Sequence, residues 1–158
     1  SLLARKSNKK MFDDVFSYLK TLIKIKKTKL KIVVLGIAFK GYPSTNDIRG
    51  TTAKYIKESI SKIFKNFIIY GYDDYVHKKD ILSLGFKHLN KLDDCFKNSD
   101  LVIIHNNNKN FKDLNIEKFS NVMKKNSIIY NFWGNDNYKN LVLKNNVKYI
   151  SFGSHKVK

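Results

Sequence analysis

The chain has 158 residues, of which 42% are hydrophobic and 13% aromatic. This length and composition predict one globular domain with a sizeable core and exclude an intrinsically disordered chain. No apolar run is long enough to span a membrane, and Cys95 is the only cysteine, which excludes an internal disulfide and a thiolate metal cage. A cytoplasmic location is therefore expected.

The formal net charge of +18 comes almost entirely from lysine, because Arg5 and Arg49 are the only arginines. The lysines are spread along the whole chain, whereas proteins that read nucleic acids usually concentrate arginine and stacking aromatics on one face. Specific nucleic-acid binding is not expected from this pattern. A non-specific basic nucleic-acid binder remains an alternative hypothesis, because diffuse positive charge attracts polyanions at low salt.

Apolar residues recur at helical spacing over residues 2–25, among them Phe12, Phe16 and Leu19, and predict an amphipathic helix ahead of the first strand. Its apolar stripe either folds back on the rest of the chain or meets a partner. Short apolar runs then alternate with helical patterns. The expected strands are residues 32–35, 67–70, 86–89, 101–104, 127–130 and 147–150, and the expected helices are residues 51–64, 76–84, 92–98, 116–123 and 138–143.

This alternation predicts an α/β fold, with a doubly wound, Rossmann-like parallel sheet of about six strands and the first strand near its centre. In such a sheet, ligands bind outside the carboxyl ends of the strands. The segments expected there are residues 36–49, 72–74, 105–108 and 131–133. They are polar, aromatic and cationic, which suits a nucleotide or a phosphorylated sugar.

The loop after the first strand contains Gly36, Lys40, Asp47 and Arg49. Asn46 and Asp47 offer a helix N-cap, with a helix expected from about Gly50, so unpaired N–H groups and the helix dipole would favour an anion at this loop. The glycine pattern is neither G-x-G-x-x-G nor a P-loop. A rare arginine beside Asp47 indicates bidentate binding or a buried ion pair.

No self-sufficient catalytic machinery is visible. Cys95 is interpreted as a buried structural cysteine, because no histidine is near it in sequence. The four histidines lack the spacing of metal ligands, and no metal site is expected. Only His105 falls at the end of a strand, and a structural role is favoured for it.

Several segments resemble one known family. Residues 31–40 (KIVVLGIAFK) and 45–51 (TNDIRGT) resemble the start of the C-terminal, UDP-binding domain of the nucleotide-sugar dehydrogenases. This family includes the UDP-glucose, UDP-N-acetylhexosamine and GDP-mannose dehydrogenases. Its members share a pattern close to LGxAFK…DxR[EG]S in this segment. Residues 70–76 (YGYDDYV) and 98–104 (NSDLVII) resemble the family's "YDPyV" and "xADxvvi" segments. Residues 3–8 (LARKSN) resemble its "AReiN" segment. The likeness covers nearly the whole chain in the right order.

The resemblance implies part of a larger enzyme. Members of the family combine an N-terminal NAD-binding Rossmann domain, a central helical region with the dimer contact, and this C-terminal domain. They oxidise the C6 alcohol of the sugar to a carboxylate in two NAD-dependent steps, through a cysteine in a G-G-x-C-x-P-K-D segment, and supply precursors of surface or capsular polysaccharides. This chain contains no such segment, and Cys95 does not match it. Residues 1–28 are then the end of the central dimerisation helix and residues 29–158 the UDP-binding domain, which is not expected to catalyse alone.

The resemblance also implies roles for individual residues. Phe39 and Lys40 match positions that contact the UDP-sugar, and Arg49 matches an arginine that reaches NAD held on the missing domain, with Asp47 orienting it. Residues 41–43 make the loop about two residues longer than the common pattern, and Asn108 replaces a family histidine.

The family's D-x-R segment, whose arginine helps to hold the substrate, appears here as Asn131-Phe132-Trp133. In place of the arginine, Trp133 is predicted to stack on a base. The alternative hypothesis is a non-catalytic interaction module that forms a homodimer through the N-terminal helix.

Overall fold

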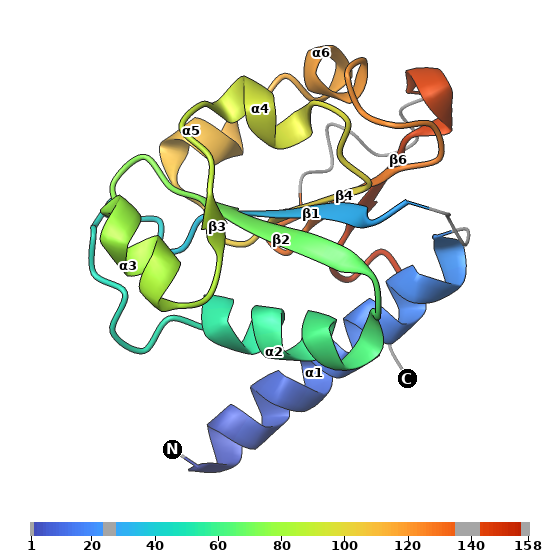
Figure 1. Cartoon of the computed structure of the whole chain (residues 1–158). Coiled ribbons are helices and arrows are strands. Elements are labelled where there is room, and N and C mark those ends of the chain that lie inside the picture. The colour runs from blue at the N-terminus through green and yellow to red at the C-terminus, as the bar shows by residue number, and fades with distance from the viewer. Residues whose placement is uncertain (1, 24–27, 135–142, 156–158) are drawn as a thin grey trace.

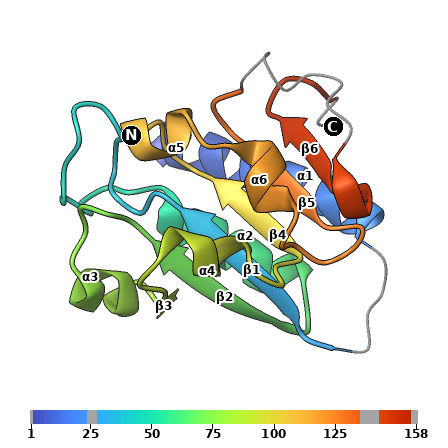
Figure 2. The same cartoon turned by 90° about the horizontal axis from the view of Figure 1, so that it is seen from above.

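A computed structural model describes residues 2–23, 28–134 and 143–155. Within these residues the chain forms a six-stranded parallel sheet in the order β3-β2-β1-β4-β5-β6, which confirms the expected doubly wound topology with the first strand central. Figure 2 shows the strands side by side in this order. The strands are β1 (Leu30–Leu35), β2 (Phe67–Tyr72), β3 (Lys87–His88), β4 (Leu101–Ile104), β5 (Ile128–Asn131) and β6 (Lys148–Ser151).

Helices cover both faces of the sheet (Figure 1). They are α1 (Leu2–Leu22), α2 (Ala53–Ile63), α3 (Lys78–Ser83), α4 (Leu92–Phe96), α5 (Lys109–Lys112) and α6 (Ile116–Ser120), with a 3₁₀ turn, η2, at Lys144–Asn146. Helices α1 and α2 lie on one face, and α4, α5 and α6 on the other. Most predicted helices are confirmed in shorter form, α5 was not predicted, and residues 138–142 of the last predicted helix lie outside the described residues.

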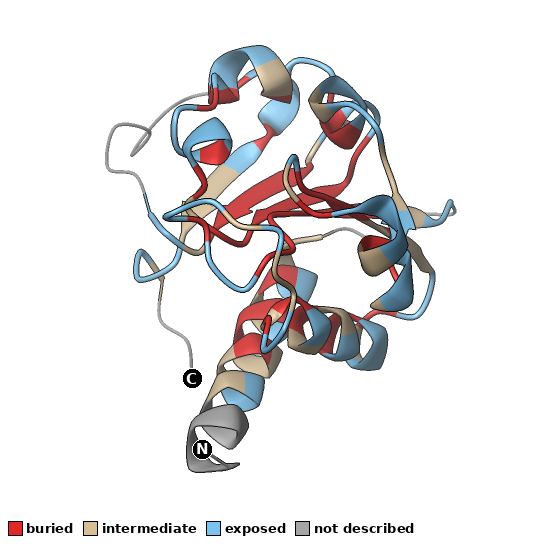
Figure 3. Ribbon diagram, turned by 90° about the vertical axis from the view of Figure 1, so that its left-hand side faces the viewer, coloured by how far each residue is buried: buried red, intermediate tan, exposed pale blue. Residues whose placement is uncertain are grey.

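The sheet divides the core into two layers because side chains alternate between its faces. Val33 and Leu35 of β1 pack with α4 and α6, whereas Ile32 and Val34 pack with α1 and α2. Strands β4 and β5 are buried along their whole length, as expected for parallel strands covered on both sides. Figure 3 shows this burial in the central strands and on the inner sides of the helices.

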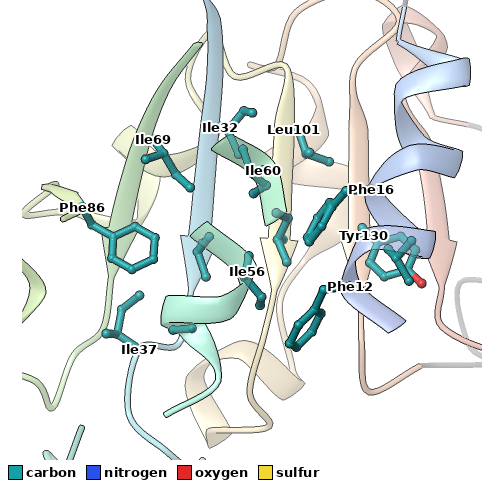
Figure 4. Packing of buried hydrophobic residues seen from close by; sticks show 14 of the residues in the cluster. Phe12, Phe16, Ile32, Ile37, Ile56, Ile60, Ile69, Phe86, Leu101 and Tyr130 are labelled. Atoms are coloured by element: carbon teal, nitrogen blue, oxygen red, sulfur yellow. The ribbon is translucent and has the colours of Figure 1, made fainter. Parts of the chain in front are cut away.

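Helix α1 is part of this core. Its residues Phe12, Val15, Phe16 and Leu19 are buried among residues of α2 and the sheet (Figure 4). Polar contacts also join α1 to α2, since Asp13 accepts hydrogen bonds from the Ser59 hydroxyl and the Lys62 ammonium, both at 2.6 Å. The apolar stripe predicted from the sequence therefore folds back on the domain. No helix of the described residues is long and apolar enough to cross a membrane.

Replacing Phe16 by alanine is expected to lower the free energy of unfolding by about 3–5 kcal/mol, because its fully buried ring leaves a cavity between α1 and the sheet. The exposed neighbour Ser17 provides the control, and Ser17→Ala is expected to stay within about 0.5 kcal/mol of the parent. Urea denaturation followed by circular dichroism measures both. Equal stability of the two variants would show that α1 does not pack on the domain in solution.

Candidate ligand-binding cleft

A cleft of about 470 Å³ lies at the carboxyl ends of β1, β4 and β5. Helix α1 contributes Asn8, Met11 and Phe12 to its wall, and most of the other lining residues come from the loops after the three strands. These loop residues are Phe39, Lys40, Gly41, Tyr42, Thr52, His105, Asn106, Asn107, Phe132 and Trp133, with Phe152 from the segment after β6. The cleft therefore contains three of the four segments expected at this edge of the sheet, but not residues 72–74.

The end of β2 is closed by Asp73. One oxygen of its buried carboxylate accepts the N–H groups of Ile37 and Ala38 at 2.8 and 3.0 Å, and the other accepts the N–H of Tyr75 at 2.9 Å. The expectation that the loop after β1 offers unpaired N–H groups is wrong for these two residues, because an internal carboxylate already occupies them. The open space lies on the β4 side of β1.

Gly41 anchors the long loop after β1. A Cβ atom there would lie 2.2 Å from the backbone nitrogen of Asn108, so only glycine fits this approach to the loop after β4. The N–H of Phe39 donates to the Asp47 carbonyl at 2.9 Å and closes the base of the loop. Lys40 extends from the rim of the cleft, with its ammonium 5.2 Å from the centre of the Phe39 ring.

Asp47 and Arg49 lie outside the cleft lining. The Arg49 guanidinium donates from Nε and Nη2 to the Asp47 carboxylate at 2.7 to 3.1 Å, and the Arg49 side chain is 89% exposed. These hydrogen bonds from Arg49 lower the pKa of Asp47 to about 2. The ion pair is bidentate but exposed. Asp47 is not a helix N-cap: it accepts the Arg49 N–H at 2.9 Å in a local turn, and α2 starts only at Ala53.

His105 supports the floor of the cleft. Its Nδ1 lies 2.7 Å from the Gly36 carbonyl oxygen, which can only accept, so Nδ1 carries the proton and Nε2 accepts from the Thr52 hydroxyl at 2.7 Å. Burial lowers the pKa of His105, which agrees with a neutral ring. The structural role predicted for this histidine fits its two satisfied nitrogens.

Asn106 lies in the segment 105–108 that was expected at this edge of the sheet, but no pattern in the sequence singled it out. Its side chain is 3% exposed, and its Oδ1 accepts the Asn108 N–H at 3.3 Å, which fixes the orientation of the amide. Its Nδ2 has no hydrogen-bond partner within the part of the chain that the structure describes. The space for this amide exists because Gly36 has no side chain: a Cβ there would lie 2.4 Å from Asn106 Cγ.

Trp133 lies where the resemblance expected an arginine. Its indole N–H donates to the His105 carbonyl at 2.9 Å, and its backbone N–H donates to Asn131 Oδ1 at 2.8 Å. Asn131 is held in turn by donating to the Tyr149 hydroxyl at 2.9 Å. Next to it, Phe132 packs edge-on against Phe12 at 5.5 Å between ring centres. The structure thus brings Phe39, Lys40 and Trp133 to one cleft.

Comparison with known proteins places the chain in a family. Residues 33–135 match the model of the UDP-glucose/GDP-mannose dehydrogenase family, UDP binding domain. The chain belongs to this family. The match covers the cleft loops from Phe39 to Trp133. No curated protein matched the chain in a separate search.

Solved structures of nucleotide-sugar dehydrogenases share the fold of this family member. The NDP-N-acetyl-D-galactosaminuronic acid dehydrogenase of Methanosarcina mazei Go1 is 22% identical over 96% of this chain, with a TM-score of 0.69. The UDP-D-ManNAc dehydrogenase of Pyrococcus horikoshii is 22% identical over 89%, with a TM-score of 0.60, and the UDP-N-acetyl-mannosamine dehydrogenase Cap5O of S. aureus is 25% identical over 88%, with a TM-score of 0.58. The chain spans 29–31% of the length of these three proteins.

Cys95 of this family member is remote from the cleft. It is fully buried in the layer of α4 and α6, and its thiol donates to the Lys91 carbonyl at 3.5 Å. Burial raises the pKa of the Cys95 thiol to about 12. In the described ranges, no three or more His, Cys, Asp or Glu side chains are grouped so that they could hold a metal ion. Cys95 is therefore the inert structural cysteine that the sequence predicted.

Cys95 is expected to resist thiol reagents at neutral pH. With a pKa of about 12, roughly one molecule in 10⁵ carries the thiolate at pH 7, and the residue is closed to solvent. Ellman's reagent should release no colour from the native chain within minutes and one equivalent per chain after unfolding in urea. Native reaction at the rate of a free thiol would contradict the burial.

Proposed function

We propose that the cleft binds the UDP part of a nucleotide sugar, and that the chain serves as the UDP-sugar-binding domain of an NAD-dependent nucleotide-sugar 6-dehydrogenase. The observation that carries this proposal is the convergence of Phe39, Lys40 and Trp133 on one cleft, although they lie nearly a hundred positions apart in the chain. Their family model is that of a UDP-binding domain, which supports the same ligand class.

The chemistry of the cleft suits such a ligand. The Lys40 ammonium at the rim offers a positive charge to the diphosphate. Phe39 and Trp133 offer ring faces to the base or the sugar. None of these groups is a nucleophile or a general base, so binding and orientation are their proposed contributions.

The oxidation itself is assigned to other domains in this proposal. NAD and the catalytic cysteine would belong to the N-terminal domain and the segment before the central helix. Arg49, which is exposed and oriented by its bidentate ion pair with Asp47, would reach the cofactor on that domain. The uronate product would enter polysaccharide precursor synthesis in the cytoplasm.

A homodimer through the N-terminal helix also remains a proposal. The outward face of α1 within residues 8–22 carries Lys10, Ser17 and Thr21, so a contact there would be polar. Sedimentation equilibrium of the chain measures the association directly, and a monomer at high protein concentration would remove this part of the proposal.

Isothermal titration calorimetry with UDP tests the binding role. Lys40→Ala is expected to weaken UDP binding about tenfold, because the diphosphate loses a charge-assisted hydrogen bond. The control is Lys112→Ala, which removes the same charge from an exposed position outside the cleft and should change affinity less than twofold. Absence of UDP binding at millimolar concentration, or equal losses in the two variants, would contradict the proposal.

A further inference from the structure

The exposed aromatic residues of this chain gather at the cleft. Within the described residues, six large hydrophobic side chains are exposed, and four of them line the cleft: Phe39 at 44%, Tyr42 at 81%, Trp133 at 57% and Phe152 at 40%. The other two, Leu82 and Val122, are aliphatic and lie elsewhere. Exposed apolar groups that cluster in this way mark binding surfaces, because leaving them in water is unfavourable.

These aromatic side chains come from three separate segments of the chain. Tyr42 comes from the loop after β1, Trp133 from the loop after β5, and Phe152 from the segment after β6. Their backbones are anchored, because Gly41 packs directly against the loop after β4 and the Phe152 N–H donates to the Asn131 carbonyl at 2.8 Å. The aromatic cluster is thus a product of the tertiary fold and not of one apolar stretch.

Trp133 is anchored through its N–H groups and leaves much of its ring exposed. Its indole N–H is used by the His105 carbonyl, and its backbone N–H by Asn131. The indole has no other polar atom, so the interaction that it can still offer is contact through its ring. A flat ring stacked on this face would bury much of the exposed indole surface.

The remainder of the lining indicates what kind of ring fits. Lys40 adds a positive charge at the rim, and Thr52 and Asn107 add polar groups to the lining. An apolar peptide segment over the cleft would leave the lysine ammonium without a partner, which costs free energy. A flat, polar heterocycle attached to an anionic group satisfies the rings and the lysine together.

We propose that Tyr42 and Trp133 form the aromatic walls of a subsite for the nucleobase, in which the base stacks on Trp133 and Tyr42 covers it from the loop after β1. This inference rests on the proposed binding of UDP and adds Tyr42 as a residue that determines affinity for the base. Phe152 borders the subsite from the C-terminal segment. The diphosphate then extends toward Lys40.

Trp133 is the only tryptophan of the chain, so its fluorescence reports the subsite directly. Titration with UDP and with uridine should quench this fluorescence, because both ligands bring the base onto the indole. Inorganic pyrophosphate should leave it unchanged, since it carries the charge without the ring. Tyr42→Ala is expected to weaken uridine binding about tenfold, and Tyr42→Phe should retain the parent affinity, because the ring face and not the hydroxyl makes the contact.

Leu82→Ala serves as the control, because it removes an exposed hydrophobic side chain that lies away from the cleft. Thermal unfolding of each variant verifies that it folds. If UDP binds by calorimetry but Trp133 fluorescence stays constant, or if Tyr42→Ala binds uridine like the parent, the stacking subsite is wrong while UDP binding stands. Quenching by pyrophosphate equal to that by UDP also overturns it. If calorimetry detects no UDP binding, the proposed function itself fails.

Discussion

The buried carboxylate of Asp73 determines on which side of β1 a ligand can lie. It joins the ends of β1 and β2 by accepting the N–H groups of Ile37 and Ala38, the same groups that a doubly wound sheet often offers to a phosphate. A hydrogen bond to a charged group contributes about 1.5–3 kcal/mol, so displacing this carboxylate by a ligand would be costly. The space between β1 and β2 is therefore closed, and the cleft opens toward β4 and β5.

The floor and wall of that cleft are continuous with the core. His105 connects Gly36, at the end of β1, with Thr52, at the start of α2, through its two ring nitrogens. Phe12 is buried in the layer under α1 and also lines the cleft. The packing of α1 on the sheet consequently shapes the ligand site, even though this helix precedes the sheet in sequence and contributes no charge to the cleft lining.

The strands could be predicted because their burial leaves a simple pattern. Residues 101–104 are apolar and are buried on both faces, so the predicted and observed bounds of β4 coincide. The convergence of Lys40 and Trp133 followed from topology alone, since the carboxyl ends of parallel strands share one edge. Helix starts were predicted less well: Asp47 has the chemistry of an N-cap but uses it in a local turn with Arg49. The four-residue helix α5 is too short to show a period, and only its cap, Asn108, marks it.

The segments that reach the cleft were predicted, but the detailed placement of their residues depends on contacts between distant segments. Asn106 is a buried, half-satisfied amide because Gly36, just after β1, leaves room for it. Tyr42 reaches the cleft wall because Gly41 lets its loop approach Asn108. Neither relation leaves a pattern within one stretch of sequence, so only the folded chain reveals them.

The distribution of charge explains why aromatic contacts carry so much of the proposed affinity. Of the lysines in the described ranges, only Lys40 lines the cleft, and the guanidinium of Arg49 is paired with Asp47 outside it. The net charge of +18 attracts a nucleotide diphosphate from a distance, but this attraction is screened within about 10 Å at moderate salt. Ring stacking acts at contact and is not screened. The lysine-rich surface thus favours encounter with anionic ligands in general, whereas the proposed stacking on the cleft rings would select those that carry a base.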